Sequence, residues 1–405
     1  MGFEQGLSGL NAASKSLDVI GNNVANASTV GFKQSQAQFA DVYATSMAGS
    51  AGGQAGIGVR VATVAQQFGQ GNITTTNNSL DMAVSGSGFF RMDTNGSITY
   101  TRNGQFQLDK TGDIVNSQGG HLTGFLPNAA GVIVATTPAD IVISTADLLP
   151  NQTANVTAGL NLDSRMAIPG VAPFNANNPL TFNNSTSSTI YDSLGGAHTA
   201  SLYFAKTGVN TWNSYLTVDG AQVGAGALTA MTFNSSGVLT APVAAVTSAA
   251  FTPAGGGAAQ TLSFNFTGTS QFGSTFGVNS LSQDGYASGH MTGFSTGSDG
   301  VVTGRYSNGQ TKTLAQVVLA NFANDQGLQP LGNNQWAETS ASGTPLVGVP
   351  GSASLGLLQT SATEDSNVDL TAELVNMITA QRVYQANAQT IKTQDQVLQT
   401  IVNLR

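Results

Sequence analysis

A heptad repeat at the C-terminal end constrains the fold of this chain most strongly. Large apolar residues recur there at every seventh position: Leu370, Met377, Tyr384, Ile391 and Leu398. A second, more mixed row begins at Leu374, and neither Gly nor Pro interrupts residues 367–405. Residues 366–369 read as a capping box before this run. The pattern predicts a helix about 55–60 Å long, and so long a helix with so narrow an apolar stripe normally packs on other helices.

The N-terminal end carries a similar but shorter pattern. Its apolar residues are spaced by threes, fours and sevens: Phe3, Leu7, Leu10, Leu17 and Val24. We expect a helix of about 25 residues, weakened at Gly21 by about 1 kcal/mol and ended near Gly31. One such helix alone would most simply pack on its own domain. Two of them, one at each end, favour helix–helix association.

The middle of the chain has the signature of β-structure. Turn dipeptides such as Asn95-Gly96 and Asn103-Gly104 separate short alternating runs at 97–100 and 105–108. Because no long helical pattern intervenes, antiparallel sandwiches or barrels are favoured. The predicted fold class is therefore mainly β: nested antiparallel β domains, sandwich- or barrel-like, plus a coiled-coil-like helical domain formed by both chain ends.

Composition indicates where the domains begin and end. Residues 31–70 are rich in Gly, Ala, Ser and Gln, which is typical of a linker or extended arm. Residues 220–283 contain no charged side chain at all. The predicted domains are a terminal helical domain (1–30 and 364–405), the arm (31–70), an inner β domain (71–145 and 285–360) and an outer β domain inserted into it (146–284).

Charge and cysteine content exclude several classes of function. Only 8% of the 405 residues are charged, the net charge is −8, and there is no Cys. The acidic balance argues against nucleic acids and anionic membranes as partners. Absence of Cys excludes disulfides, thiolate zinc sites and Cys nucleophiles. We see neither a membrane-spanning stretch nor a secretory signal peptide, so an extracellular location would need another export route.

Candidate catalytic or metal sites are weak. His121, His198 and His290 lack the spacing of metal ligands, and we expect them on exposed turns or strands. Residues 293–297 match the Gly-x-Ser-x-Gly pattern of serine hydrolases, but no His follows them in the sequence. The sequence therefore predicts no catalytic residue, cofactor or metal, and we expect a protein that is not an enzyme.

Three segments resemble a known family. Residues 18–33, DVIGNNVANASTVGFK, are similar to the N-terminal motif of the bacterial flagellar rod and hook proteins. Residues 366–382 resemble the C-terminal signature of the same family, and residues 88–125 resemble its shared β domain. Val30 stands where rod proteins more often have Pro, and residues 384–395 are close to the hook form. The stretch 361–364 departs from the usual family pattern.

This resemblance implies a structural subunit of the flagellar hook. Such a subunit builds a curved tube that acts as a universal joint, transmits motor torque and contains the export channel. The implied partners are copies of the same chain, the distal rod, the hook cap (scaffolding) protein, the hook–filament junction protein and the type III export apparatus, with no nucleic acid and no membrane. The implied location is extracellular, reached without a cleaved signal peptide. A distal rod subunit and a β-rich extracellular adhesin remain alternatives.

Helix pattern and family resemblance together predict an assembly interface. We expect one set of apolar residues of the first helix to bury against a second set on the last helix, from the same and adjacent subunits. The first set is Leu7, Leu10, Leu17 and Val24; the second is Leu370, Leu374, Met377, Tyr384, Ile391 and Leu398. Phe39 and Tyr43 resemble a short export signal of the family, although a packing contact of the arm would explain them equally well.

Overall fold

The computed structural model describes residues 2–42, 56–128 and 130–403. The chain forms two compact units. Thr145–Thr292 and Arg305–Gln310 make up the outer unit; Met1–Ser144, Gly293–Gly304 and Thr311–Arg405 make up the other, here called the basal unit. The basal unit therefore joins the helical ends to inner β strands that the sequence assigned to a separate domain.

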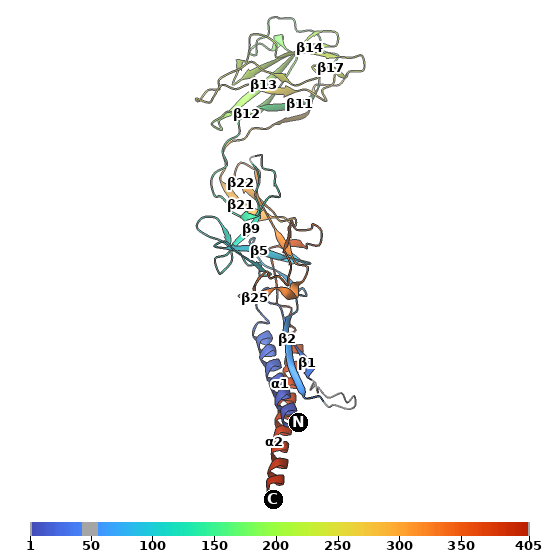
Figure 1. Ribbon diagram of the computed structural model, residues 1–405. Helices are drawn as coiled ribbons and strands as arrows, with labels where there is room; N and C mark the ends of the chain where they lie inside the picture. The colour runs from blue at the N-terminus through green and yellow to red at the C-terminus, as the bar shows by residue number, and fades with distance from the viewer. Residues whose placement is uncertain (1, 43–55, 129, 404–405) are drawn as a thin grey trace. The chain divides into compact units, whose positions relative to one another are not determined.

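Both chain ends are helical, and the two helices lie side by side (Figure 1). Helix α1 spans Gly2–Ala25 and helix α2 spans Leu370–Asn403. The α2 helix begins after Asp369, whose Oδ1 accepts the backbone N–H groups of Thr371 at 2.9 Å and Ala372 at 3.1 Å. The cap is therefore Asp369 and not Ser366, the first residue of the predicted capping box, because Asp369 is the acceptor next to the first free N–H groups.

Helix α1 ends six residues before Gly31, earlier than predicted. Its last turn is closed by Asn26, whose side chain donates to the carbonyl of Asn22 at 2.9 Å. Gly31 itself has φ +71°, and a Cβ there would lie 2.5 Å from the backbone nitrogen of Asn103. Glycine is required at this position both for its left-handed conformation and for the close approach of another chain segment.

A β-hairpin occupies most of the segment that the sequence predicts as a linker or extended arm. Strands β1 (Ser35–Val42) and β2 (Gly58–Gln66) pair antiparallel, and both pack on α1. Asn23 of α1 fixes the start of β1: its amide donates to the carbonyl of Ser35 at 2.8 Å and accepts the N–H of Ser35 at 2.9 Å. Apolar/polar alternation is limited to short runs such as residues 36–39 and 59–61, so the strand signal is weak.

The remaining strands of the basal unit form one large sheet and two short pairs. The sheet runs in the order β21-β22-β23-β9-β5-β6-β26-β25, and β3 pairs with β29 and β4 with β28. The strands are β3 Ile73–Thr75, β4 Met82–Ser85, β5 Phe89–Thr94, β6 Ser97–Thr101, β7 Gln107–Leu108, β8 Ile114–Val115, β9 His121–Phe125, β10 Ala139–Asp140, β21 Met291–Thr296, β22 Val301–Tyr306, β23 Thr311–Val317, β24 Leu319–Asn321, β25 Gln329–Gly332, β26 Gln335–Ala337, β27 Leu346–Gly348, β28 Leu357–Thr360 and β29 Ala362–Glu364. A 3₁₀ turn covers Asp325–Gly327.

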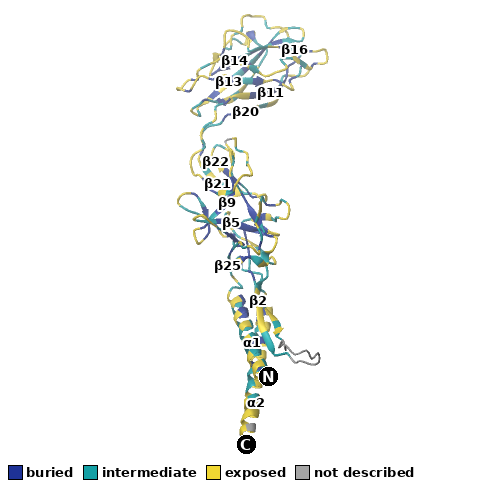
Figure 2. Ribbon diagram, in the orientation of Figure 1, coloured by how far each residue is buried: buried dark blue, intermediate teal, exposed yellow. Residues whose placement is uncertain are grey.

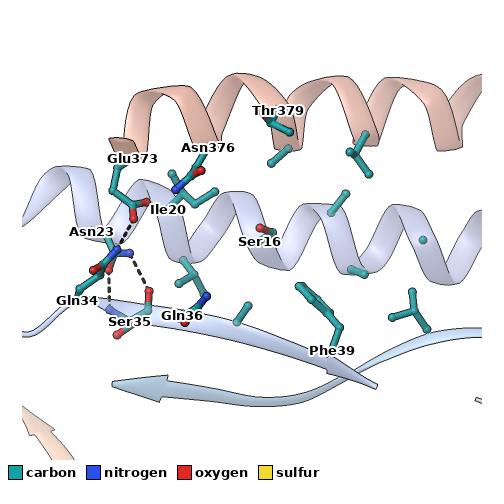
Figure 3. Close-up of a pocket in the computed structure, with 18 of the residues that line it drawn as sticks. Ser16, Ile20, Asn23, Gln34, Ser35, Gln36, Phe39, Glu373, Asn376 and Thr379 are labelled. Atoms are coloured by element: carbon teal, nitrogen blue, oxygen red, sulfur yellow. Dashed lines mark hydrogen bonds between the residues drawn. The ribbon is translucent and has the colours of Figure 1, made fainter. Parts of the chain in front are cut away.

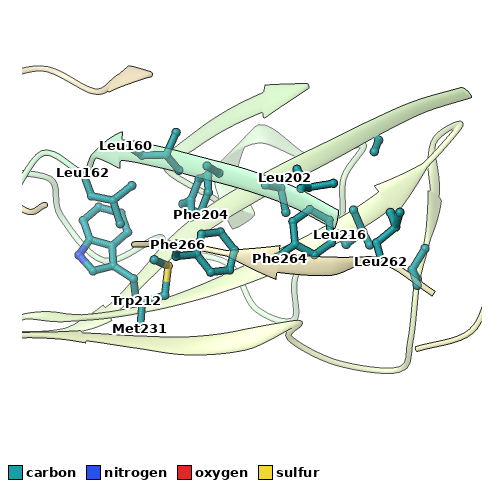
Figure 4. Packing of buried hydrophobic residues seen from close by; sticks show 14 of the residues in the cluster. Leu160, Leu162, Leu202, Phe204, Trp212, Leu216, Met231, Leu262, Phe264 and Phe266 are labelled. Carbon is teal, nitrogen blue, oxygen red and sulfur yellow. The ribbon is translucent and has the colours of Figure 1, made fainter. Parts of the chain in front are cut away.

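The outer unit is a two-sheet β structure. One sheet has the order β12-β13-β14-β16-β17 and the other β18-β19-β11-β20. Its elements are β11 Asn155–Asn161, 3₁₀ turn Pro179–Thr181, β12 Asn184–Tyr191, β13 Ala197–Gly208, β14 Thr211–Val218, β15 Ala221–Gln222, β16 Thr229–Phe233, β17 Leu239–Ala241, β18 Val246–Thr247, β19 Ser263–Asn265 and β20 Gly277–Gln283. Between the sheets lies an apolar core that includes Phe204, Trp212 and Phe264 (Figure 4). The mainly β fold with helices from both chain ends is thus confirmed.

Neither helix of the described residues combines the length and the apolar character needed to cross a membrane.

Candidate assembly interface and its anchor

Small residues line the seam where α1 meets α2. A Cβ added at Gly6 would lie 3.0 Å from Cγ1 of Ile391, and one at Gly9 would lie 2.7 Å from Oδ1 of Asn387. Together with the buried Ala13 and Ala380, these glycines let the two backbones approach closely. The close approach of the two helices therefore depends on side chains that are absent or short, with Ile391 packed against Gly6.

The residues predicted for the assembly interface are largely uncovered within one chain. Five of them are exposed: Leu7, Leu370, Leu374, Tyr384 and Leu398. The other five are half-buried: Leu10, Leu17, Val24, Met377 and Ile391. Further apolar side chains on the same helices are also exposed, among them Phe3, Val375, Ile378, Val383, Val397 and Val402. Figure 2 shows the contrast between these exposed helices and the buried β cores. Within one chain Ile391 packs on α1, but the apolar residues on the outward faces of the two helices stay exposed to solvent.

A buried ion cluster, here called the anchor, joins the helices to the inner β strands. Glu364 Oε1 contacts the Lys33 amine at 2.6 Å, and its Oε2 contacts the Arg102 guanidinium at 3.1 Å. The side chains of Lys33 and Glu364 are completely inaccessible to solvent. Lys33 follows α1 in the chain, Arg102 follows β6, and Glu364 ends β29 shortly before α2. Three distant segments therefore meet at one carboxylate.

The anchor is well supplied with hydrogen bonds, as buried charges should be, and only the Nε of Arg102 lacks a partner among the described residues of this cluster. Lys33 also donates to the carbonyl of Gly69 at 2.8 Å, Arg102 to that of Gly86 at 2.8 Å, and Glu364 accepts the N–H of Gly71 at 2.9 Å. Burial lowers the pKa of the Lys33 amine, and the charge of Glu364 opposes that shift. Glu364 thus compensates the desolvation of both cations, and its loss would leave them buried and unpaired.

Asn367 extends the anchor to the first turn of α2. Its Oδ1 accepts the N–H of Gln34 at 2.7 Å, and its amide donates to the carbonyl oxygens of Gln67 at 2.7 Å and Gly69 at 3.0 Å. One side chain therefore joins the start of α2 to both flanks of the hairpin. Next to it, Glu373 Oε1 accepts a hydrogen bond from the Gln34 side chain. The second oxygen of Glu373 is buried and has no hydrogen-bond partner among the described residues.

A groove of about 970 Å³ lies between α1, α2 and β1 (Figure 3). Most of its wall is apolar or small, including Ala12, Val19, Ala37 and Val383. Glu373 stands at its polar end with Asn23 and Gln34. Phe39, predicted as part of an export signal, lies on β1 and lines the groove. Tyr43, the other half of that predicted signal, lies outside the described residues.

The positions of the serine motif and of His198 test whether either one could form a catalytic or metal-binding site. Ser295 lies on β21, which is followed by strand β22 and not by the helix of a nucleophile elbow. Contrary to expectation His198 is buried: its Nδ1 lies 2.6 Å from Asp219 and its Nε2 lies 3.4 Å from Asp192. The spacing of Asp192, His198 and Asp219 in the sequence does not reveal that turns of the chain bring both carboxylates to this histidine. Across the described residues, no group of three or more acids and histidines is placed to hold a metal ion.

Four protein-family models match successive parts of the chain. They are described as flagella basal body rod protein (residues 3–33), flagellar hook protein FlgE/F/G D1 domain (83–159), flagellar basal body protein FlaE D2 domain (161–286) and flagellar basal body rod FlgEFG protein C-terminal (359–404). The flagellar hook protein FlgE of Escherichia coli K12 is 44% identical over 413 residues, covering 100% of both chains. The chain belongs to the flagellar hook protein family.

Other relatives agree with this assignment. The hook protein of Salmonella typhimurium is 43% identical over 100% of both chains, and that of Borreliella burgdorferi is 33% identical over 99% of this chain and 98% of the relative. The crystal structure of the Helicobacter pylori flagellar hook protein FlgE2 has the same fold, with a TM-score of 0.54 and 15% identity over 72% of this chain and all of that one. These full-length matches favour the hook over the distal rod and the adhesin.

Each residue of the anchor lies in a different segment matched by a family model. Lys33 closes the N-terminal segment, Arg102 lies in the D1 segment, and Glu364 lies in the C-terminal one. Sequence analysis singled out the segments that contain Lys33 and Arg102 for their resemblance, placed Glu364 in a stretch that departs from the family pattern, and did not pair these residues. Long-range ion pairs carry no spacing signal, so only the presence of a buried Lys, Arg and Glu inside motifs could have drawn attention to them.

Proposed function

We propose that this hook-family subunit polymerises through its terminal helices into a curved tube that surrounds an export channel. That tube acts as a flexible universal joint, transmitting torque from the rod to the filament. The observation that carries the assembly mechanism is the exposure of the large apolar rows on α1 and α2 within one chain. A side chain such as Leu contributes about 1.5–3 kcal/mol when it becomes fully buried, so neighbouring subunits that cover these rows would supply a large driving force.

Folding of the helices is coupled to this assembly. Each helix is anchored at one end, where Lys33, Glu364 and Asn367 hold it to β strands. Along the rest of its length α2 meets α1 on one narrow face only. Most of the stability of a helix in a protein comes from packing of its apolar face, so neighbours that cover the exposed rows would complete it.

Bending would come from the outer units. A tube that rotates while bent needs each subunit to change its extent along the tube during every turn. Contacts without ion pairs can slide at low cost, because no strong directional bond has to break, and residues 220–283 of the outer unit are free of charge. We propose that outer units slide over one another through the exposed residues of this uncharged segment, which is a shear type of motion.

The remaining partners follow from the proposed place in the hook. These are the distal rod below, the hook cap during growth, the hook–filament junction protein above and the type III export apparatus, which would deliver the chain to the cell exterior without a cleaved signal peptide. Phe39 and Tyr43 stay candidates for its export signal. The role is structural, so no catalytic residue or cofactor is assigned.

Leu374→Asp tests assembly through the helices. Leu374 is 45% exposed on α2, so Asp should leave the single chain folded and abolish tubes under polymerising conditions, followed by light scattering and negative-stain imaging. Gln381→Asp, also exposed on α2, is the matched control and should still polymerise. Met377→Asp and Ile391→Asp should also abolish tubes while leaving the β units folded, although Ile391→Asp additionally removes the contact with Gly6 within one chain. Normal tubes from Leu374→Asp would contradict the proposal, and straight tubes from the unmodified chain would favour a rod role.

A further inference from the structure

Two apolar surfaces of the basal unit remain uncovered, and their shapes are complementary, since one is a groove and the other a projecting helix end. One is the groove between α1, α2 and β1. The other is the end of α2, here called the overhang, residues 395–403. Ile391 lies against Gly6, close to the start of α1, so the overhang continues past that helix, as Figure 1 shows. Its Val397, Leu398 and Val402 are 50%, 54% and 72% exposed.

We propose that the groove of one chain receives the overhang of a second copy. This inference rests on the proposed assembly through the terminal helices and names the segment and the site that meet. The overhang is an amphipathic helical end about 13 Å long, and the α2 wall of the groove, from Glu373 to Asn387, is about 21 Å long. Laying the apolar face of a helix into an apolar groove is a common mode of recognition, and here the two lengths are compatible.

The geometry of this contact produces a polymer and not a closed pair. Groove and overhang are different surfaces of the same chain, so a bound pair still has one free groove, on one copy, and one free overhang, on the other. A head-to-tail contact of this kind continues as an open helical assembly when its rotation does not close a ring. A contact between two grooves would instead stop at a dimer, which would not build a tube.

Charge indicates the direction in which the overhang lies. Glu373 is buried at the polar end of the groove with one oxygen lacking a partner. If the second copy's overhang runs parallel to α2, with its Leu398 level with Thr379, its Lys392 comes level with Glu373. Lys392 is exposed in the single chain and can supply the missing donor. The reversed direction would place Lys392 near Asn387, where no acid lines the groove.

Cysteine cross-linking tests the contact directly, because the natural chain has no Cys. Thr379 lines the groove and Leu398 lies on the overhang, about 28 Å farther along the same helix at 1.5 Å per residue. A disulfide needs Cα atoms within about 7 Å. The double variant Thr379→Cys/Leu398→Cys can therefore cross-link only between copies, and its oxidised tubes should give a ladder of covalent multimers on a non-reducing gel.

The matched control moves the second cysteine to the polar face of the same overhang. Thr379→Cys/Gln396→Cys should form tubes but no ladder. Tubes of the Leu398 variant that give no ladder would overturn the inference and leave the proposed function intact, whereas the proposed function fails only if Leu374→Asp assembles normally. A ladder of equal strength from the Gln396 control would also overturn it, because the overhang would then lack the proposed orientation.

A charge exchange gives a second, independent measurement. Glu373→Lys should raise the protein concentration needed for tube formation about tenfold, which corresponds to about 1.4 kcal/mol, since it places two cations together. Adding Lys392→Glu to the same chain should restore most of the loss, because every groove then meets an acid again. A double variant that assembles no better than Glu373→Lys would contradict the parallel placement of the overhang.

Discussion

The outer unit buries its large apolar residues, whereas the terminal helices leave many of theirs exposed. In the outer unit, Phe204, Trp212 and Leu216 lie fully buried between two sheets. On α2, residues of the same chemical kind, such as Leu374 and Leu398, are about half exposed. The helices are held instead by a buried ion cluster at one end. The outer unit therefore has a complete core within one chain, and the helices do not.

This difference indicates that the interactions that stabilise the protein are not the ones that position its helices. Apolar burial makes a unit stable by itself, roughly in proportion to the area covered. Buried ion pairs add little net stability, but breaking one partner is costly because it leaves an unpaired charge. We infer that the anchor sets where the helices leave the β strands, while neighbouring copies supply most of the stabilisation along their length.

The variant Glu364→Ala should have the largest effect and tests whether the anchor supports the basal unit alone. Removing this carboxylate leaves Lys33 and Arg102 buried without a counter-charge, and we expect the basal unit to lose about 3–5 kcal/mol. Urea unfolding would be followed through Trp336, which lies in the basal unit, while Trp212 reports on the outer unit and should not shift. Glu4→Ala, which removes an exposed acid of α1, should change stability by less than about 0.5 kcal/mol. Equal shifts at both tryptophans would show that the two units do not unfold independently.

A smaller effect is expected at the helix seam. Gly9→Leu would force a side chain into Asn387, and such overpacking typically costs about 1–3 kcal/mol. Gly21 on the same helix has no atom within 4 Å of an added Cβ. Gly21→Ala should therefore raise helix stability by about 1 kcal/mol. Far-UV circular dichroism during heating measures both; similar behaviour of the two variants would mean that the seam is not the tight contact described above.

The smallest effect concerns pH and the outer unit. The hydrogen bond that His198 donates to Asp219, helped by Asp192, raises the pKa of His198 above its usual value of 6.5, against the opposing effect of burial. A raised pKa means that the folded state favours the protonated ring, so this contribution is complete below about pH 6.5 and is lost as the pH rises through the folded-state pKa. In a Trp336→Phe background, the urea midpoint reported by Trp212 should fall between about pH 5.5 and about pH 8.5. His198→Gln should flatten that slope; an unchanged slope would assign it to another group.

Sequence reasoning identified what depends on local pattern. Both terminal helices, the β-rich middle and hairpin turns such as Asn95-Gly96 follow from periodicity and turn chemistry, and the fold class is confirmed. The seam was not foreseen, because a heptad pattern draws attention to large residues such as Leu7 and Leu17, whereas close helix contact needs Gly6 and Gly9. The anchor was not foreseen either, since it depends on how distant segments meet. The strands at residues 35–42 and 58–66 were not predicted, because their composition, rich in Gly, Ala, Ser and Gln, is typical of a linker.

The anchor also has a consequence for the order of folding. Its two strongest links join residue 364 to residues 33 and 102, across 331 and 262 positions of sequence. When the chain is made from its N-terminus, Lys33 and Arg102 are present long before Glu364, the carboxylate that pairs with both. The outer unit, whose segments 145–292 and 305–310 both precede Glu364, can condense in the meantime. Closure of the anchor is therefore a late event, which can occur only once the chain extends through Glu364, just before α2 begins at Leu370.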